Sequence, residues 1–130
     1  MLTPPVPLRL DIALPDRVRQ GEPVPIALRL INPAPHPSTV YLAGRPVAFD
    51  IVVARTDGVA IWRRLHGAVI NAILQVRVLA PGEALTFSDT WRQQDDRGLP
   101  TAPGEYRVTG VLPGDPPEEL RTEASPLRIL

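Results

Sequence analysis

The sequence predicts an all-β protein, an immunoglobulin-like antiparallel β-sandwich of about eight or nine short strands. Short runs in which apolar and polar residues alternate are typical of half-buried strands, and turn signals separate these runs about every 8–12 residues. The chain also holds 17 prolines in 130 residues. Helices tolerate proline poorly, whereas a protein of strands and turns places it in loops and at sheet edges.

The first two strands show the alternation most clearly. Every second position is apolar in residues 8–14, and the same period returns in residues 24–30. Side chains two positions apart lie on one face of a strand, so each run has one face for the core. Residues 19–22 form the turn between them. Pro25 cannot donate to a ladder, so its nitrogen should face solvent or a sheet edge.

Further strands follow the prolines of residues 33–37. They are expected at residues 39–42, 47–54, 59–63, 74–78, 85–91, 106–112 and 127–130. The Thr-Asp-Gly of residues 56–58 predicts a hairpin turn. Residues 64–72 have apolar side chains at helical spacing, but Gly67 weakens a helix. We therefore expect a crossover loop there, with room for one helical turn.

A single domain spanning residues 1–130 is expected, because the length suits one domain and no internal repeat is visible. The 14 basic residues balance the 14 acidic ones, and the pI is near 6.7. This balance argues against nucleic acid or an anionic membrane as a partner. The chain has no cysteine, which excludes disulfides, thiolate metal sites and a cysteine nucleophile.

The expected location is the cytoplasm, without a membrane partner. The residues that follow Met1 lack the basic start and apolar run of a signal peptide. No apolar stretch approaches the ~20 residues that a membrane-spanning helix needs.

Catalysis is not expected. His36 and His66 fall in different loops, and none of the three serines lies in a Gly-x-Ser-x-Gly elbow. A triad of Ser88, His66 and either Asp50 or Asp89 is conceivable, because triads are defined in space. Loop histidines and a capping serine are the favoured interpretation.

Metal binding is not expected either. Asp89, Asp95 and Asp96 lie close together in the sequence, but they lack the ligand spacing and the turn glycine of a calcium loop. A solvated acidic loop is the favoured interpretation. The sequence therefore predicts no catalytic residue, no metal and no cofactor.

Trp91, Asp89 and Tyr106 are assigned structural roles. Trp91 shares the parity of the apolar residues before it, which places it in the core. Asp89 has the same parity and should be partly buried, accepting hydrogen bonds from backbone N–H groups or an arginine. Tyr106 begins a strand after a Pro-Gly-Glu turn and can bond back to a neighbouring loop, as in a tyrosine corner. The parity of Trp62 leaves both a core position and an exposed anchor open.

Six segments, taken in order, carry a resemblance to a known family. They are residues 44–53, the Thr-Asp-Gly of residues 56–58, the Ile-Trp-Arg of residues 61–63, the Leu-Ala-Pro-Gly-Glu of residues 79–83, the Phe-Ser-Asp-Thr-Trp of residues 87–91 and the Pro-Gly-Glu-Tyr of residues 103–106. The sequence resembles the BsuPI family, the intracellular proteinase inhibitors of bacteria, over about residues 28–112. This resemblance implies a cytoplasmic immunoglobulin-like sandwich that inhibits an intracellular serine proteinase of the subtilisin type. The chain departs from the family pattern in its proline content and in a longer loop at residues 92–103.

Binding is expected in loops. An inhibitor that imitates a substrate presents a stiff, extended loop, because stiffness reduces the entropy lost on docking. One proline-stiffened stretch fits this description and consists of Leu99, Pro100 and Thr101. A second candidate contact surface consists of Arg63, Arg64 and Leu65. No sequence rule chooses between them, and an ordinary connection is the alternative at both.

Three functional hypotheses follow. The leading one is an inhibitor that occupies the cleft of a protein partner, an intracellular serine proteinase, through a loop and without a covalent step. The second is an immunoglobulin-like interaction module without inhibitory activity, which should show a broad apolar patch or an open strand edge. The third is an enzyme, which should show a deep pocket with perturbed ionisable groups.

Overall fold

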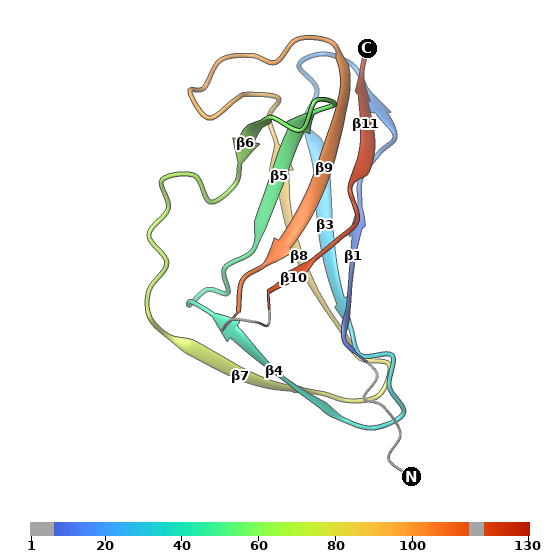
Figure 1. The fold of residues 1–130 in the computed structure, drawn as a ribbon, viewed down its shortest axis with the longest axis vertical. Helices are drawn as coiled ribbons and strands as arrows, with labels where there is room; N and C mark the ends of the chain where they lie inside the picture. Colours follow the sequence, from blue (N-terminus) through green and yellow to red (C-terminus); the bar gives the residue numbers. More distant parts are fainter. Residues whose placement is uncertain (1–6, 115–118) are drawn as a thin grey trace.

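The computed structural model describes residues 7–114 and 119–130. These residues form eleven strands and no helix (Figure 1). The strands are β1 (Arg9–Ala13), β2 (Arg17–Val18), β3 (Val24–Ile31), β4 (Ser38–Ala43), β5 (Asp50–Arg55), β6 (Ala60–Arg63), β7 (Leu74–Leu79), β8 (Ala84–Trp91), β9 (Gly104–Leu112), β10 (Leu120–Arg121) and β11 (Ser125–Ile129).

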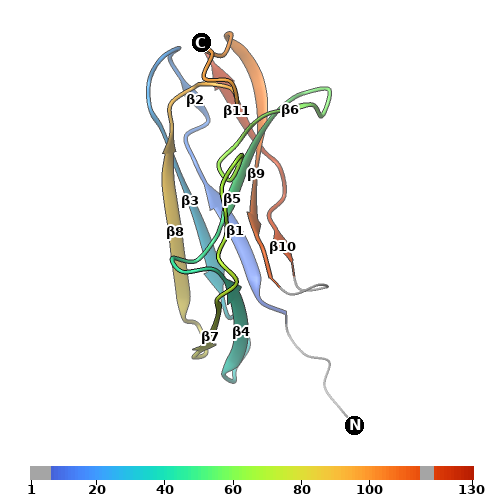
Figure 2. The same cartoon turned by 90° about the vertical axis from the view of Figure 1, so that its left-hand side faces the viewer.

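Two sheets face each other across the core. One has the order β1-β3-β8, and the other has the order β2-β11-β9-β5-β6, with β10 also paired to β9. Figure 2 shows these two layers from the side. The strands pair antiparallel, apart from the short parallel pair of β2 and β11. A separate ribbon of β4 and β7 lies at the end of the molecule away from the C-terminus.

The core follows the alternation seen in the sequence. In β3, the side chains of Val24, Ile26, Leu28 and Leu30 are at most 1% exposed, while the residues between them face outward. Full burial of such a side chain stabilises the fold by about 1.5–3 kcal/mol. Gly110 in β9 faces this row, because a Cβ atom there would collide with the side chain of Leu28. The glycine therefore lets the two sheets approach each other closely.

Trp91 and Tyr106 fix the end of the core nearest the C-terminus, each through a side-chain hydrogen bond. Trp91 is 1% exposed, donates its indole N–H to the Gln94 carbonyl at 2.9 Å, and stacks near Trp62 at 6.0 Å between ring centres. Trp62 itself is half-buried. The hydroxyl of Tyr106 donates to the Ala102 carbonyl at 2.6 Å, which is the hydrogen bond of a tyrosine corner.

The expected strands are present, with differences at particular places. β5 begins at Asp50 and not at Val47, because the Ala48 N–H turns back to the Ala43 carbonyl at 2.8 Å. Residues 64–72 contain no helical turn. Two successive tight turns occupy residues 63–68 instead, and Gly67 has a positive φ of 70°. The two-residue strands β2 and β10 were not expected, since so short a segment has no periodicity to detect.

The proline in β3 lies where the sequence places it. β1 covers β3 only as far as Ala27, which pairs with Ala13. Pro25 therefore has a strand neighbour on one side only, Thr90 of β8. A proline at the uncovered end of an otherwise central strand removes no ladder hydrogen bond on the open side.

Candidate functional site

The loop between β8 and β9 is anchored at its base by Gln93. This side chain is 3% exposed and makes three hydrogen bonds to the turn between β2 and β3. Its amide donates to the carbonyls of Arg19 (2.7 Å) and Glu22 (2.9 Å), and its oxygen accepts from the N–H of Gly21 (3.0 Å). The backbone carbonyl of Gln93 accepts both from the N–H and from the hydroxyl of Thr101. The loop therefore leaves the sandwich from a fixed base.

The tip of this loop is held by Asp95. Its carboxylate accepts from the backbone N–H groups of Arg97 and Leu99, both at 2.9 Å. Its own N–H donates to the Leu99 carbonyl at 2.8 Å. The side chain of Leu99 is 56% exposed. The tip thus presents an apolar side chain on a residue whose own N–H and carbonyl are already paired.

Asp96 joins this loop to the second candidate surface. Its N–H donates to the Ile61 carbonyl at 2.9 Å, and its carboxylate accepts from the Arg63 N–H at 2.9 Å. The second carboxylate oxygen lies 3.5 Å from Nδ1 of His66. Both segments lie toward the C-terminal end of the molecule (Figure 1). We call residues 63–66 and 95–101, held together in this way, the docking loops.

Arg64 connects the two sheets. Its Nε donates to the Asp89 carboxylate of β8 at 2.8 Å, and Nη1 donates to the Phe49 carbonyl at 2.8 Å. The guanidinium carbon lies 3.7 Å from the centre of the Phe49 ring, within the range of a cation–π interaction. The side chain of Arg64 is 26% exposed. Two of its three guanidinium nitrogens are thus bonded within the molecule.

The six candidate contact residues occupy different environments. The exposed ones are Arg63, Leu99 and Pro100. Leu65 is half-buried, and its N–H donates to the Asp50 carboxylate at 3.0 Å. Thr101 is 6% exposed and bonded to Gln93. The structure brings the two candidate stretches together through Asp96, and it turns Thr101 and Arg64 toward the protein.

The residues that build this surface are not those that the sequence marks. Asp95 and Asp96 were expected in a solvated loop, but both are half-buried and accept backbone hydrogen bonds. Asp95 stands three residues before Gly98, a turn pattern that could have indicated its role. No local sequence pattern marks Gln93, because its three hydrogen-bond partners are more than 70 residues away along the chain. Asp89 accepts hydrogen bonds from an arginine, Arg64, and from a backbone N–H, that of Thr90, as expected, but its side chain is 45% exposed rather than partly buried.

The described residues do not assemble the conceivable triad. The carboxylate that faces His66 belongs to Asp96, Asp89 is bound by Arg64, and no hydrogen bond joins His66 to Ser88 in the described part of the chain. Residues 7–114 and 119–130 also contain no group of three potential metal-ligating side chains of the His, Cys, Asp and Glu types.

A displaced pKa occurs on an exposed turn, that between β5 and β6. The Arg55 side chain donates to the Asp57 carboxylate and holds its pKa below the ordinary value, and the N–H of Val59 acts in the same direction. This pair shapes the hairpin turn.

Among the described residues, no helix has the length and apolar character needed to cross a membrane.

Comparison with solved structures identifies the fold. The CARDB domain of the PF1109 protein from Pyrococcus furiosus, crystallised with di-metal ions, superposes with a TM-score of 0.51 at 14% identity, covering 95% of this chain and 88% of that chain. The solution structure of the same domain gives a TM-score of 0.49 at 13% identity, covering 95% and 94%. The DNA glycosylase AlkC of Pseudomonas fluorescens gives 0.47 at 15% identity, covering 93% of this chain and 30% of that chain. The first likeness confirms the predicted immunoglobulin-like β-sandwich.

Comparison with family models gives one match that covers most of the chain. The model described as BsuPI, intracellular proteinase inhibitor, matches residues 13–117. No curated protein matches the sequence significantly.

Proposed function

Because the chain belongs to the BsuPI family of intracellular proteinase inhibitors, we propose that it inhibits an intracellular serine proteinase of the subtilisin type through its docking loops. The observation that carries this proposal is the exposed Leu99 side chain on a loop braced by Asp95, Asp96 and Gln93. A braced loop loses little conformational entropy on docking, which favours affinity. The inhibitor acts in the cytoplasm, and its balanced charge supports a protein partner over a nucleic acid.

The hydrogen bonds of Leu99 support one particular binding mode for the loop. A substrate-like inhibitor offers the N–H and carbonyl of its specificity residue to the enzyme, which aims an oxyanion hole at that carbonyl. In this loop the Leu99 N–H donates to Asp95, and the Leu99 carbonyl accepts from the Asp95 N–H. We therefore propose that the Leu99 side chain enters an apolar pocket of the proteinase while the backbone stays folded. The bond between Leu99 and Pro100 then remains uncleaved.

The test is a titration of the full chain against a subtilisin-type serine proteinase, with a metalloproteinase as control. We expect dose-dependent inhibition of the serine proteinase alone, and mass spectrometry should find the chain intact after incubation. Absence of inhibition, or inhibition of both enzymes alike, would remove the serine-proteinase proposal. Cleavage after Leu99 would mean that the loop opens and binds as a substrate does.

The Leu99→Ala variant tests the contact residue. The truncation removes about three methylene equivalents, worth about 0.8 kcal/mol each. With 56% of the side chain available to a partner, the loss is about 1.3 kcal/mol, or about a tenfold higher inhibition constant. The matched control is Leu74→Ala, the same change at a 45% exposed leucine in β7 at the other end of the molecule. Equal inhibition constants for the two variants would exclude Leu99 as the contact.

One observation favours a second candidate, the interaction module. The outward face of the β4–β7 ribbon is apolar, as an interaction module would require, and it is far from the docking loops.

A further inference from the structure

The apolar face of β7 points away from the core. The side chains of Leu74, Val76 and Val78 are 45%, 57% and 62% exposed. Tyr41 of β4 pairs with Val76 on the same outward face and is 42% exposed. Three aliphatic residues at every second position of a strand normally mark its buried side. Here they form a continuous exposed stripe, and stripes of this kind mark contact surfaces.

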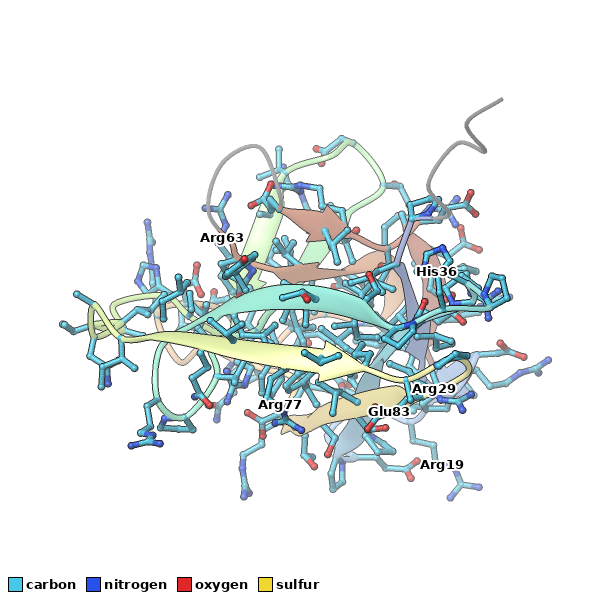
Figure 3. All side chains as sticks on the ribbon, turned by 90° about the horizontal axis from the view of Figure 1, so that it is seen from below. Arg19, Arg29, His36, Arg63, Arg77 and Glu83 are labelled. Carbon is cyan, nitrogen blue, oxygen red and sulfur yellow. The ribbon has the colours of Figure 1, made fainter. Side chains whose placement is uncertain are left out.

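The polar residues of β7 lie on the opposite face. Gln75 pairs with Leu42, and Arg77 pairs with Val40, whose side chains are buried against the sandwich. Paired residues of neighbouring strands share a face. Figure 3 views the molecule from this end, with β4 and β7 lying across the foreground and Arg77 labelled beside them. The stripe is therefore a property of the strand as folded: the polar residues lie on the other face, where Gln75 is half-buried and Arg77 is exposed.

β7 also has an open edge. It pairs with β4 alone in the described part of the chain. At the start of this ladder the Gly44 N–H donates to the Ile73 carbonyl at 2.7 Å. Backbone groups alternate in direction along an antiparallel strand, so those of Gln75 and Arg77 face β4. Those of Leu74, Val76 and Val78 face outward.

Nothing in β7 protects this edge. Natural edge strands carry proline, bulges, several charges or a covering segment, because an open edge can pair with another chain. β7 has no proline, and its pairing with β4 runs through all six residues without a register shift. Its single charge is Arg77. An unprotected edge next to an apolar stripe is suited to strand pairing with a partner.

We propose that the partner is a second copy of this chain, paired antiparallel along β7 about a two-fold axis at Val76. In this register the outward-facing Leu74 meets Val78 of the copy, Val76 meets its own counterpart, and Val78 meets Leu74. All three residues with outward backbone groups then find a partner, and their side chains lie beside aliphatic neighbours. The dimer has a continuous four-stranded sheet of two β7 and two β4 strands.

Charge selects this register over its neighbours. With the axis at Val76, each Arg77 lies opposite Gln75 of the copy. A shift that moves the axis to residue 77 places the two Arg77 side chains opposite each other, and like charges directly opposite are destabilising. A shift to residue 75 leaves Val78 opposite residue 72, which lies outside the strand. The edge of β7 is thus complementary to itself at one register.

The docking loops lie at the other end of the sandwich from β7. A dimer formed through β7 therefore leaves both sets of docking loops uncovered, and self-association does not depend on the proposed inhibition.

Sedimentation equilibrium of the full chain over a concentration series tests the association. We expect a mass that rises toward twice the 14.2 kDa of one chain. Val76→Lys places two ammonium groups together at the axis, so this variant should stay monomeric with an unchanged circular dichroism spectrum. Thr39→Lys adds the same charge to the same face one strand away, and it should still dimerise. The proposal would be overturned by a wild-type chain that is monomeric throughout or by a Val76→Lys variant that dimerises normally. Loss of the dimer in Thr39→Lys would also overturn it, because that result would indicate packing of the two sheets face to face.

Cysteine cross-linking tests the register without relying on affinity. The chain has no cysteine of its own. In the proposed dimer, hydrogen-bonded residues at the axis have Cα atoms about 5.5 Å apart, which is within the range for a disulfide. Val76→Cys should therefore cross-link under mild oxidation. Val78 is slightly more exposed than Val76, but its counterpart in the copy lies four residues away along the strands, about 13 Å distant, so Val78→Cys should not cross-link. Equal cross-linking of both variants, or none in Val76→Cys, would refute the register.

Discussion

Replacing Gln93 tests whether the docking loops are held by the protein body. Gln93→Ala removes three side-chain hydrogen bonds to the turn between β2 and β3. Each such bond contributes about 1 kcal/mol net, so the free energy of unfolding should fall by about 3 kcal/mol. Unfolding entropy is about 2.1 cal/mol/K per residue. For 130 residues this makes 1 kcal/mol equal to about 4 °C, and the melting temperature should fall by about 11 °C.

The backbone of Gln93 provides an internal check. Its φ is 54°, a conformation that costs a residue with a Cβ atom about 1 kcal/mol relative to glycine. Gln93→Gly should therefore lose only about 2 kcal/mol, although it also removes the side chain. The exposed neighbour is the control, since Gln94→Ala should change stability by less than about 0.5 kcal/mol.

The assay is urea unfolding followed by tryptophan fluorescence and by circular dichroism. We propose that residues 1–130 form one domain, in which case the two transitions coincide. A Gln93→Ala variant within about 0.5 kcal/mol of the wild type would refute the reasoning that these three bonds anchor the loop. If Gln93→Ala is less stable but inhibits the proteinase as strongly as the wild type, the hydrogen bonds of Gln93 contribute to stability and not to inhibition.

Three further predictions concern stability and ionisation. Arg64→Ala should lower the free energy of unfolding by about 2 kcal/mol in urea titrations, because it removes a hydrogen bond to the Phe49 carbonyl and the packing on the Phe49 ring. Asp89→Ala should lower it by less than about 1 kcal/mol, since the Asp89 carboxylate is 45% exposed. Equal losses in the two variants would contradict this ranking. Gly110→Ala should cost about 1–3 kcal/mol by forcing Leu28 aside, and an unchanged melting temperature would show that the core yields at this point. The pKa of Asp57 is lowered in the folded state, chiefly by its hydrogen bond from Arg55, so the stability that this carboxylate adds is present above its unfolded pKa and is lost as pH falls through its folded pKa. An NMR titration should find this pKa raised in Arg55→Gln, and no change would rule out the hydrogen bond as the cause.

The fold could be predicted because its information is local. Alternation in β3 and the Thr-Asp-Gly turn are readable within a few residues, and both are reproduced in the structure. The alternation of β8 is reproduced except at Asp89, which is exposed. The same alternation does not predict which face of β7 is exposed. Alternation shows that Leu74, Val76 and Val78 share a face, but it does not say which face is covered. That depends on where β4 lies, which is a tertiary property.

The candidate site was only partly predictable for a related reason. Leu99 and Arg63 stood out as residue types that form contacts, and the structure exposes both. The residues that position them bond to backbone atoms far away in the sequence, as Asp96 does with Arg63 and Gln93 with Gly21. Any residue type offers such backbone atoms, so no composition or spacing rule marks them in advance.

The way in which Asp95 holds the loop tip bears on how specificity could diversify. Its carboxylate bonds to the N–H groups of residues 97 and 99 and not to their side chains. Every amino acid except proline supplies such an N–H. The side chains at these two positions can therefore be exchanged by evolution or by an engineer while the frame that carries them keeps its shape. If the docking loops bind the proteinase as proposed, a library randomised at residues 97 and 99 alone would vary the contacting side chains while the hydrogen bonds of Asp95 keep the backbone of the loop in place.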